Sequence, residues 1–121
     1  MSGLSISDLI RRLASEKCEA CDASKVLSND EANARLKLLP GWTLEGDSIQ
    51  KQFRFRSYLL GLEFACSLGR IAEAEDHHPD MLVGWRRVRV TLSTHAIRGL
   101  SNNDFIMAAK SELEYAKHNS D

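Results

Sequence analysis

The sequence predicts an α+β fold, a two-layer sandwich in which a four-stranded, largely antiparallel sheet carries helices on one face. Two strand-pair patterns, within residues 42–55 and 81–94, are separated by one long helical pattern at residues 57–75. Further helical patterns lie before the first pair and after the second. After an extra N-terminal helix, the expected order is therefore α-β-β-α-β-β-α.

The composition is that of an ordinary globular domain. The chain has 121 residues, of which 43% are hydrophobic and 27% charged, and this length suits one domain. A formal net charge of −1 argues against general binding to nucleic acids or anionic membranes. No run approaches the roughly 20 apolar residues that span a bilayer, and the first 16 residues lack the pattern of a secretory signal. A cytoplasmic location is expected.

The N-terminal part divides into an extension and the start of the main domain. Residues 1–26 are expected to form a helical extension and connector, because apolar residues recur at helical spacing within residues 5–17. Residues 27–121 are expected to form the main domain. Its first helix begins at Ser28, which forms a capping box with Glu31, and it ends at a Pro-Gly pair.

The first strand pair and the longest helix come next. Residues 42–44 are followed by a polar turn and by an alternating run at residues 49–55 that only Lys51 interrupts. The helix at residues 57–75 has a wide apolar face, which suggests packing against the sheet and against a partner. Pro79 disfavours helical geometry at the residue before it, so the helix ends by then.

The second strand pair leads into the last helix. Residues 81–83 form a short strand, and Gly84 is expected to make the turn. Residues 86–94 form the strongest strand, with one apolar and one polar face. In the last helix, Ser101 is the expected N-cap and Asp104 occupies the third helical position.

The three cysteines do not indicate a disulfide framework, because their number is odd and no secretory signal accompanies them. Cys18 and Cys21 have the spacing of a metal or redox pair, but there is no second pair and no preceding strand. We interpret them as a structural or incidental pair, with a weak zinc or redox role as the alternative. Cys66 lies among apolar residues in a helix and is expected in the core.

The candidate site lies between Glu73 and His95, where three of the four histidines occur together with acidic side chains. Because histidine gives and takes protons near neutral pH, His77, His78 and His95 are candidate acid–base groups. Glu73 lies four residues before His77, so the two share a helix face if the helix runs as far as His77, and a carboxylate there would fix the tautomer of the imidazole or hold a polar ligand edge. Pro79 stiffens the loop, which favours preorganisation.

Other residues of the site have a structural interpretation beside the functional one. Trp85 offers a flat apolar surface to a ring-shaped ligand, or it belongs to the core. Asp76 is solvated at a helix end, or it has a local role, because an acid there opposes the macrodipole. Asp104 is most simply explained as a helix cap. The two adjacent histidines suit a surface loop or a metal site, although neighbours in sequence rarely point to one centre.

Together these residues resemble a family signature, that of the pterin-4a-carbinolamine dehydratases. The positions that carry the likeness are Glu73, His77, His78, Pro79, Trp85, His95 and Asp104. Residues 93–95 and 99–100 match as well, and the likeness covers about residues 27–116. Ser101 stands where the family often has threonine, and residues 1–26 lie outside the resemblance.

The resemblance implies a fold of the predicted order and a reaction, the dehydration of 4a-hydroxytetrahydropterin to quinonoid dihydropterin and water. That substrate is formed when aromatic amino acid hydroxylases use tetrahydropterin, so a functional link to such a hydroxylase in tetrahydrobiopterin recycling is implied. The resemblance further implies that no metal or organic cofactor is needed. The implied partners are a small-molecule pterin and further copies of the chain in a homodimer or homotetramer, with no nucleic acid and no membrane.

Elimination of water needs an acid for the leaving hydroxyl at C4a and a base for the N5 proton. We expect His77 and His95 to share these roles, in an order that depends on the substrate stereoisomer. His78, the third residue of the catalytic group, is expected mainly to bind and orient the pterin. The expected substrate-binding residues are Glu73, Asp76, Pro79, Trp85 and Asp104.

Other functions stay open at this stage. The same fold could serve as a non-catalytic dimerisation or transcription-cofactor module, but such a module need not keep a full set of acid–base residues. A metal-binding protein and a role in another pterin pathway, such as molybdopterin metabolism, are further alternatives. Two open sheet edges and a wide apolar helix face predict a dimer through sheet pairing, or a tetramer through helix packing.

Overall fold

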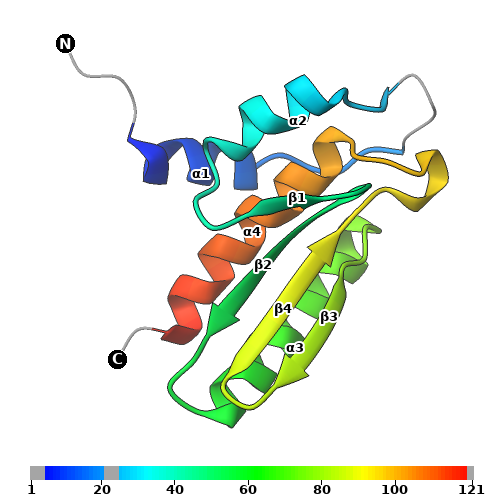
Figure 1. Ribbon diagram of the computed structural model, residues 1–121. Helices are drawn as coiled ribbons and strands as arrows, with labels where there is room; N and C mark the ends of the chain where they lie inside the picture. Colours follow the sequence, from blue (N-terminus) through cyan, green and yellow to red (C-terminus); the bar gives the residue numbers. More distant parts are fainter. Residues whose placement is uncertain (1–4, 21–24, 120–121) are drawn as a thin grey trace.

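The computed structural model describes residues 5–20 and 25–119, and it contains one open sheet with helices packed against it (Figure 1). The elements in chain order are α1 (Ile6–Ala14), α2 (Asn29–Leu36), β1 (Thr43–Glu45), β2 (Ser48–Arg54), α3 (Tyr58–Glu75), β3 (Asp80–Gly84), β4 (Arg87–Leu92), the 3-10 turn η2 (His95–Ile97) and α4 (Asn102–Asn119). The predicted α+β class and element order are confirmed.

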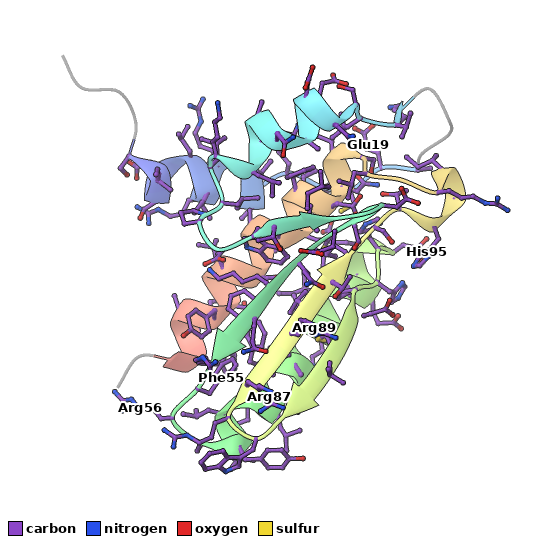
Figure 2. All side chains as sticks on the ribbon, viewed as in Figure 1. Glu19, Phe55, Arg56, Arg87, Arg89 and His95 are labelled. Atoms are coloured by element: carbon purple, nitrogen blue, oxygen red, sulfur yellow. The ribbon has the colours of Figure 1, made fainter. Side chains whose placement is uncertain are left out.

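The sheet has the strand order β1-β2-β4-β3, and every neighbouring pair is antiparallel. Its covered face is apolar because side chains alternate along each strand: Val88, Val90 and Leu92 of β4 are fully buried. The long helices α3 and α4 pack against each other and against the strands (Figure 1). On the other face Arg87 and Arg89 extend into solvent (Figure 2).

Lys51, the residue that breaks the alternation of β2, lies on the covered face between Ile49 and Phe53. Its ammonium group donates to Glu112 Oε2 of α4 at 2.6 Å and to the Pro40 carbonyl at 3.0 Å. The methylene groups of Lys51 are therefore buried, while its ammonium group is paired. A long cationic side chain can occupy the covered face of a sheet in this way. A lysine in the alternating run thus marks a contact between the strand and the last helix.

Helix ends place the residues around the candidate site. The expected capping box between Ser28 and Glu31 is present at the start of α2. Helix α3 begins after Ser57, whose hydroxyl accepts from the Leu60 N–H at 3.1 Å. Its last residue is Glu75, and the C-cap residue Asp76 adopts the left-handed conformation with φ 53°. This conformation reverses the direction of the chain.

The expectations for Gly84 and Cys66 need correction, and the expectation for Cys21 is not tested. Gly84 is the last residue of β3 and pairs with Arg87, so the turn is made by Trp85 and Arg86, with a φ of 58° at Arg86. The expectation that Cys66 lies in the core is wrong: its side chain is exposed, because the buried face of α3 carries Gly61, Phe64, Leu68 and Ala72. Cys21 lies outside the described residues.

No helix in the described ranges combines the length and the apolar character needed to cross a membrane.

Candidate active site

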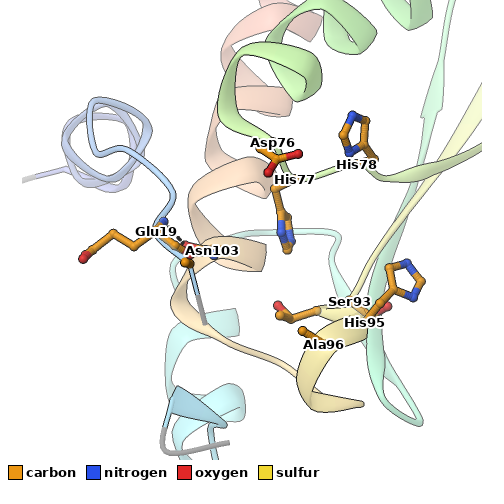
Figure 3. Close-up of a pocket in the computed structure, with 10 residues that line it drawn as sticks. Glu19, Asp76, His77, His78, Ser93, His95, Ala96 and Asn103 are labelled. Atoms are coloured by element: carbon orange, nitrogen blue, oxygen red, sulfur yellow. Dashed lines mark hydrogen bonds between the residues drawn. The ribbon is translucent and has the colours of Figure 1, made fainter. Parts of the chain in front are cut away.

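A pocket of about 230 Å³ lies where the end of α3, the end of β4 and the start of α4 meet (Figure 3). Its lining residues are Glu19, Ala20, Asp76, His77, His78, Ser93, Thr94, His95, Ala96 and Asn103. The three predicted catalytic histidines therefore lie around one pocket, although they come from two segments of the chain. The volume is below the range of about 300–1,000 Å³ that is typical for drug-sized ligands, so it suits a small ring compound.

His77 is buried and is held by Asp104. Its Nε2 lies 2.7 Å from Asp104 Oδ1, and only 9% of His77 and none of Asp104 is exposed. The left-handed turn at Asp76 directs the chain so that the His77 N–H bonds back to the Ala72 carbonyl at 3.1 Å. As a result the imidazole points inward, toward α4.

The carboxylate of Asp104 has hydrogen-bond partners at both of its oxygens. Besides His77, it accepts the Thr94 hydroxyl at 2.7 Å and the Ser101 N–H at 2.9 Å, both through Oδ2. The Ser101 hydroxyl lies 2.8 Å from Thr94 Oγ1 and acts as its donor, because the proton of Thr94 is given to the carboxylate. Asp104 thus caps α4, as predicted, and also holds His77. A buried carboxylate with several donors is a rigid group.

This network determines the tautomer of His77. An ionised carboxylate only accepts hydrogen bonds, so the proton of the neutral imidazole of His77 must lie on Nε2. Nδ1 then carries a free lone pair. A ring held in this way is prepared to take a proton at Nδ1 and to return it, and the negative charge of Asp104 compensates the positive charge that His77 acquires in between.

The expectation that Glu73 holds His77 is wrong for this structure. Helix α3 ends at Glu75, so His77 leaves the helix face that Glu73 occupies. Glu73 Oε2 is instead paired with His78 Nε2, and both side chains are exposed, with His78 lining the pocket. His78 therefore has its own carboxylate partner. The pair presents a charged or polar edge to whatever enters the pocket.

His95 lies at the first residue of η2, just beyond the end of β4, and its ring is exposed at the pocket mouth (Figure 2). The turn that carries it is closed by the bridge between Thr94 and Gly99, and by a bond of 3.2 Å from the Arg98 N–H to the His95 carbonyl. Within the described part of the chain no side chain is bonded to the His95 ring. Thr94 links this turn directly to Asp104, so the two imidazoles are supported by one network.

Four predicted residues lie outside the pocket lining: Glu73 and Asp104, which pair with His78 and His77, and also Trp85 and Pro79. Trp85 occupies the turn between β3 and β4 with 70% of its surface exposed, and the Arg86 guanidinium lies 5.0 Å from the centre of its ring. Pro79 follows the histidine pair without facing the cavity. The substrate-binding roles of Trp85 and Pro79 therefore stay predictions, whereas Asp76, which is exposed, does line the pocket.

Sequence reasoning missed several lining residues, most of all Glu19, Ala20 and Asn103. Asn103 is adjacent to Asp104 and nearly buried, but no periodicity or motif distinguishes it from its exposed neighbour Asn102. Glu19 and Ala20 belong to the N-terminal extension, to which the family resemblance assigned nothing. Thr94 could have been found, because it directly precedes His95 in the matched run.

Cys18 directly precedes the lining residues Glu19 and Ala20 and is a half-buried free thiol. Burial, together with the nearby carboxylate of Glu75, raises the pKa of Cys18 to about 12. The thiol therefore stays protonated at neutral pH, unlike a redox-active or metal-binding cysteine. In residues 5–20 and 25–119, no three His, Cys, Asp or Glu side chains converge as a metal site requires.

One imidazole with a defined tautomer and a second at the mouth of a small pocket are the equipment of an acid–base enzyme. Comparison with known proteins identifies the class of enzyme. The family model for pterin 4 alpha carbinolamine dehydratase matches residues 25–113. The chain belongs to this family, and it is accordingly a hydro-lyase.

Individual relatives agree with this assignment. A Dechloromonas aromatica protein, whose name also places it among the pterin-4-alpha-carbinolamine dehydratases, is 43% identical over 101 residues, which cover 83% of this chain and 90% of that protein. Pterin-4-alpha-carbinolamine dehydratase 2, mitochondrial, of Arabidopsis thaliana is 41% identical over 81% of this chain and 56% of its own length. The crystal structure of a transcriptional coactivator/pterin dehydratase from Brucella melitensis has a TM-score of 0.70 at 33% identity, covering 74% of this chain and 97% of that one. Since one relative is named as mitochondrial, the cytoplasmic location stays a prediction.

Proposed function

We propose that this protein dehydrates a 4a-hydroxytetrahydropterin to the quinonoid dihydropterin and water. The observation that carries the proposal is the position of His77, whose Nε2 is bound by the buried Asp104 while its other nitrogen is left to a pocket that His95 also lines. The family supplies the substrate class. The geometry supports two proton-transfer groups of the kind that this elimination needs.

The elimination balances with two imidazoles and no further reagent. One histidine donates a proton to the hydroxyl at C4a, the C–O bond breaks and water leaves. The other takes the proton from N5, and the electron pair of the N5–H bond forms the double bond between N5 and C4a. His77 and His95 take these roles in the order that the configuration at C4a demands. The two imidazoles exchange protonation states in each turnover, and solvent restores them.

His78 and Glu73 serve binding more than proton transfer. His78 lines the pocket and its side chain is paired with that of Glu73, so together they offer both a donor and an acceptor to the polar edge of a pterin ring. Asp76, beside them in the lining, adds a further acceptor. We place this enzyme after a tetrahydropterin-dependent hydroxylation of aromatic amino acids, because that reaction forms the carbinolamine substrate.

A second candidate function deserves one test. The Brucella melitensis relative is described as a transcriptional coactivator as well as a pterin dehydratase. A binding role of this kind would not need the pair formed by His77 and Asp104. Turnover by the purified chain therefore separates the enzyme from a pure interaction module.

The first measurement is the decay of 4a-hydroxytetrahydropterin absorbance in a stopped-flow instrument, with the substrate generated by a hydroxylase. We expect the decay to accelerate in proportion to the concentration of this protein. A decay rate that equals the uncatalysed rate, measured with folded protein at micromolar concentration, would contradict the proposal and favour the interaction module.

The chain is further proposed to form a homodimer or homotetramer. The strands β1 and β3 are sheet edges, and the exposed face of α3 carries the large apolar side chains of Tyr58, Leu59 and Leu62. Exposed edges and apolar patches favour association. Light scattering at neutral pH is expected to show twice or four times the monomer mass of 13.6 kDa. A monomer over the micromolar range would refute this prediction.

A further inference from the structure

The N-terminal extension reaches the active-site pocket, although it precedes the region that the family model matches. Helix α1 packs across α4 (Figure 1), and its last residue, Ala14, is buried there. The chain then continues beside the N-terminal half of α4 as residues 15–20, which we call the strap. The end of the strap, Glu19 and Ala20, lines the pocket.

Asn103 binds the strap through both groups of its side chain. Its Oδ1 accepts the Glu19 N–H at 2.9 Å, and its Nδ2 donates to the Glu19 carbonyl at 2.6 Å. A carboxamide is the side chain that offers a donor and an acceptor side by side, so this pairing resembles one rung of a β-ladder. Only 6% of Asn103 is exposed, so the pairing is shielded from competing water.

Two charged side chains fix the chain before Glu19. Glu75 Oε1 accepts the N–H of Cys18, within the strap, at 2.7 Å, and Lys110 donates to the carbonyl of Ala14, at the end of α1, at 2.6 Å. The carboxylate and the ammonium lie 3.9 Å apart, and both are largely buried. The raised pKa of Cys18 agrees with a strap that is docked, because the thiol is desolvated only in that position.

These anchors are neighbours of the acid–base pair. Glu75 lies two residues before His77, and Asn103 directly precedes Asp104. The backbone segments that position His77 and Asp104 therefore also position the strap. Figure 3 shows Glu19 and Asn103 on one side of His77 and His95 on the other, so a ligand in this pocket lies between His95 and the strap.

We propose that Glu19 and Ala20 form the substrate-binding wall opposite His95, and that Asn103 and Glu75 are positioning residues that hold this wall against a bound pterin. The inference rests on the proposed function for the identity of the ligand. The Glu19 backbone is bound by Asn103, the Glu19 side chain extends away from His77 (Figure 3), and the side chain of Ala20 is a methyl group. The wall therefore offers a short, largely apolar surface that fits the flat ring of a pterin and leaves the polar contacts to His78 and its partner Glu73.

The positioning role predicts a change in KM with little change in kcat. In Asn103→Ala the strap loses two hydrogen bonds, and we expect KM for the carbinolamine to rise about tenfold while kcat stays within about twofold. The matched control is Asn102→Ala, which alters the exposed neighbour outside this pocket and should leave both constants unchanged. Glu75→Ala should raise KM similarly, whereas Glu75→Gln, which keeps an oxygen for the Cys18 N–H, should restore it.

A second readout follows the strap itself. In the full-length chain with Cys21→Ser and Cys66→Ser, iodoacetamide reports on Cys18 alone. We expect slow alkylation, slower still when 7,8-dihydrobiopterin is bound, and at least about tenfold faster alkylation after Asn103→Ala, because an undocked thiol regains its ordinary ionisation. Protection by the pterin is the sign that the strap touches the ligand.

The outcomes separate this inference from the proposed function. If the wild-type protein catalyses dehydration but KM is unchanged in Asn103→Ala and Glu75→Ala, and the dihydropterin does not protect Cys18, the inference is overturned and the dehydratase stands. If the wild-type protein does not catalyse dehydration, the proposed function fails, and protection of Cys18 by the pterin then decides alone whether the strap is part of a pterin site. If the alanine variants lose kcat instead of raising KM, the strap supports the catalytic pair and is not a substrate wall.

Discussion

The double variant His77→Ala/His95→Ala is expected to lose about 10³- to 10⁴-fold in kcat/KM for the carbinolamine while it stays folded. Each positioned acid or base typically contributes about 10²- to 10⁴-fold, and the two act on the same elimination. Their effects are expected to be less than multiplicative, because water can replace one partner more easily once the other is gone. The measurement is the stopped-flow decay at saturating and subsaturating substrate.

The expected loss of kcat/KM is large because His77 is preorganised before the substrate binds. Its Nε2–H is bound to a fully buried carboxylate, so the lone pair on Nδ1 is available without any rearrangement. His95, on the turn after β4, lines the same pocket with an exposed ring that exchanges protons with solvent. The single variants should therefore differ between the two C4a epimers of the substrate, because each epimer presents its hydroxyl to a different imidazole.

His118→Ala is the matched control for these variants. It removes an imidazole of the same kind, which is bonded to Ser67 and to the Glu114 carbonyl near the C-terminal end of α4. His118 lies 14 residues beyond Asp104 on this helix, or about 21 Å along its axis. Its loss should leave kcat/KM unchanged. Wild-type kcat/KM in the double variant would exclude histidine acid–base catalysis at this pocket.

The variant Asp104→Asn is expected to keep the fold and to lose about 10²-fold or more in kcat. The carboxamide oxygen can still accept from Thr94 and Ser101, but the amide group then faces His77 Nε2 with a donor. His77 must accept this bond and move its proton to Nδ1. The ring then presents a proton to the pocket in place of a lone pair, so it fails as a base.

Asp104→Ala should instead destabilise the protein by about 3–5 kcal/mol, because it leaves buried donors of His77, Thr94 and Ser101 without an acceptor. Urea unfolding measures this loss. Ser57→Ala is the matched control: it removes the N-cap of α3 at the end of the helix remote from His77 and should cost about 1 kcal/mol without any effect on kcat.

These two substitutions distinguish the roles of Asp104. If Asp104 were only a helix cap, Asp104→Asn would lower the midpoint of unfolding and leave the kcat of the folded protein at its wild-type value. If it also orients His77, kcat falls in Asp104→Asn even where stability is nearly retained. The latter is the result expected from the geometry.

The elements of this fold could be predicted from the sequence because their signals are local. The alternation of Val88, Val90 and Leu92 is repeated in their burial, and the capping box of Ser28 and Glu31 forms as expected. Local signals failed for Cys66, because a cysteine among apolar neighbours in a helix can lie on the buried face or on the exposed face. Cys66 lies two positions after the buried Phe64, and this spacing places it on the opposite side of α3.

The sequence by itself determined the α+β class, the order of the elements and the three histidines of the candidate site. It did not determine which carboxylate serves which histidine. Sequence spacing favoured Glu73 for His77, but the left-handed residue Asp76 turns the chain, and Asp104, 27 residues away, becomes the partner. The hydrogen bond between Glu19 and Asn103 spans 84 residues and could likewise not be predicted from the sequence. Periodicity and capping reveal contacts within one element, whereas contacts between distant segments exist only after the helices have packed against the sheet.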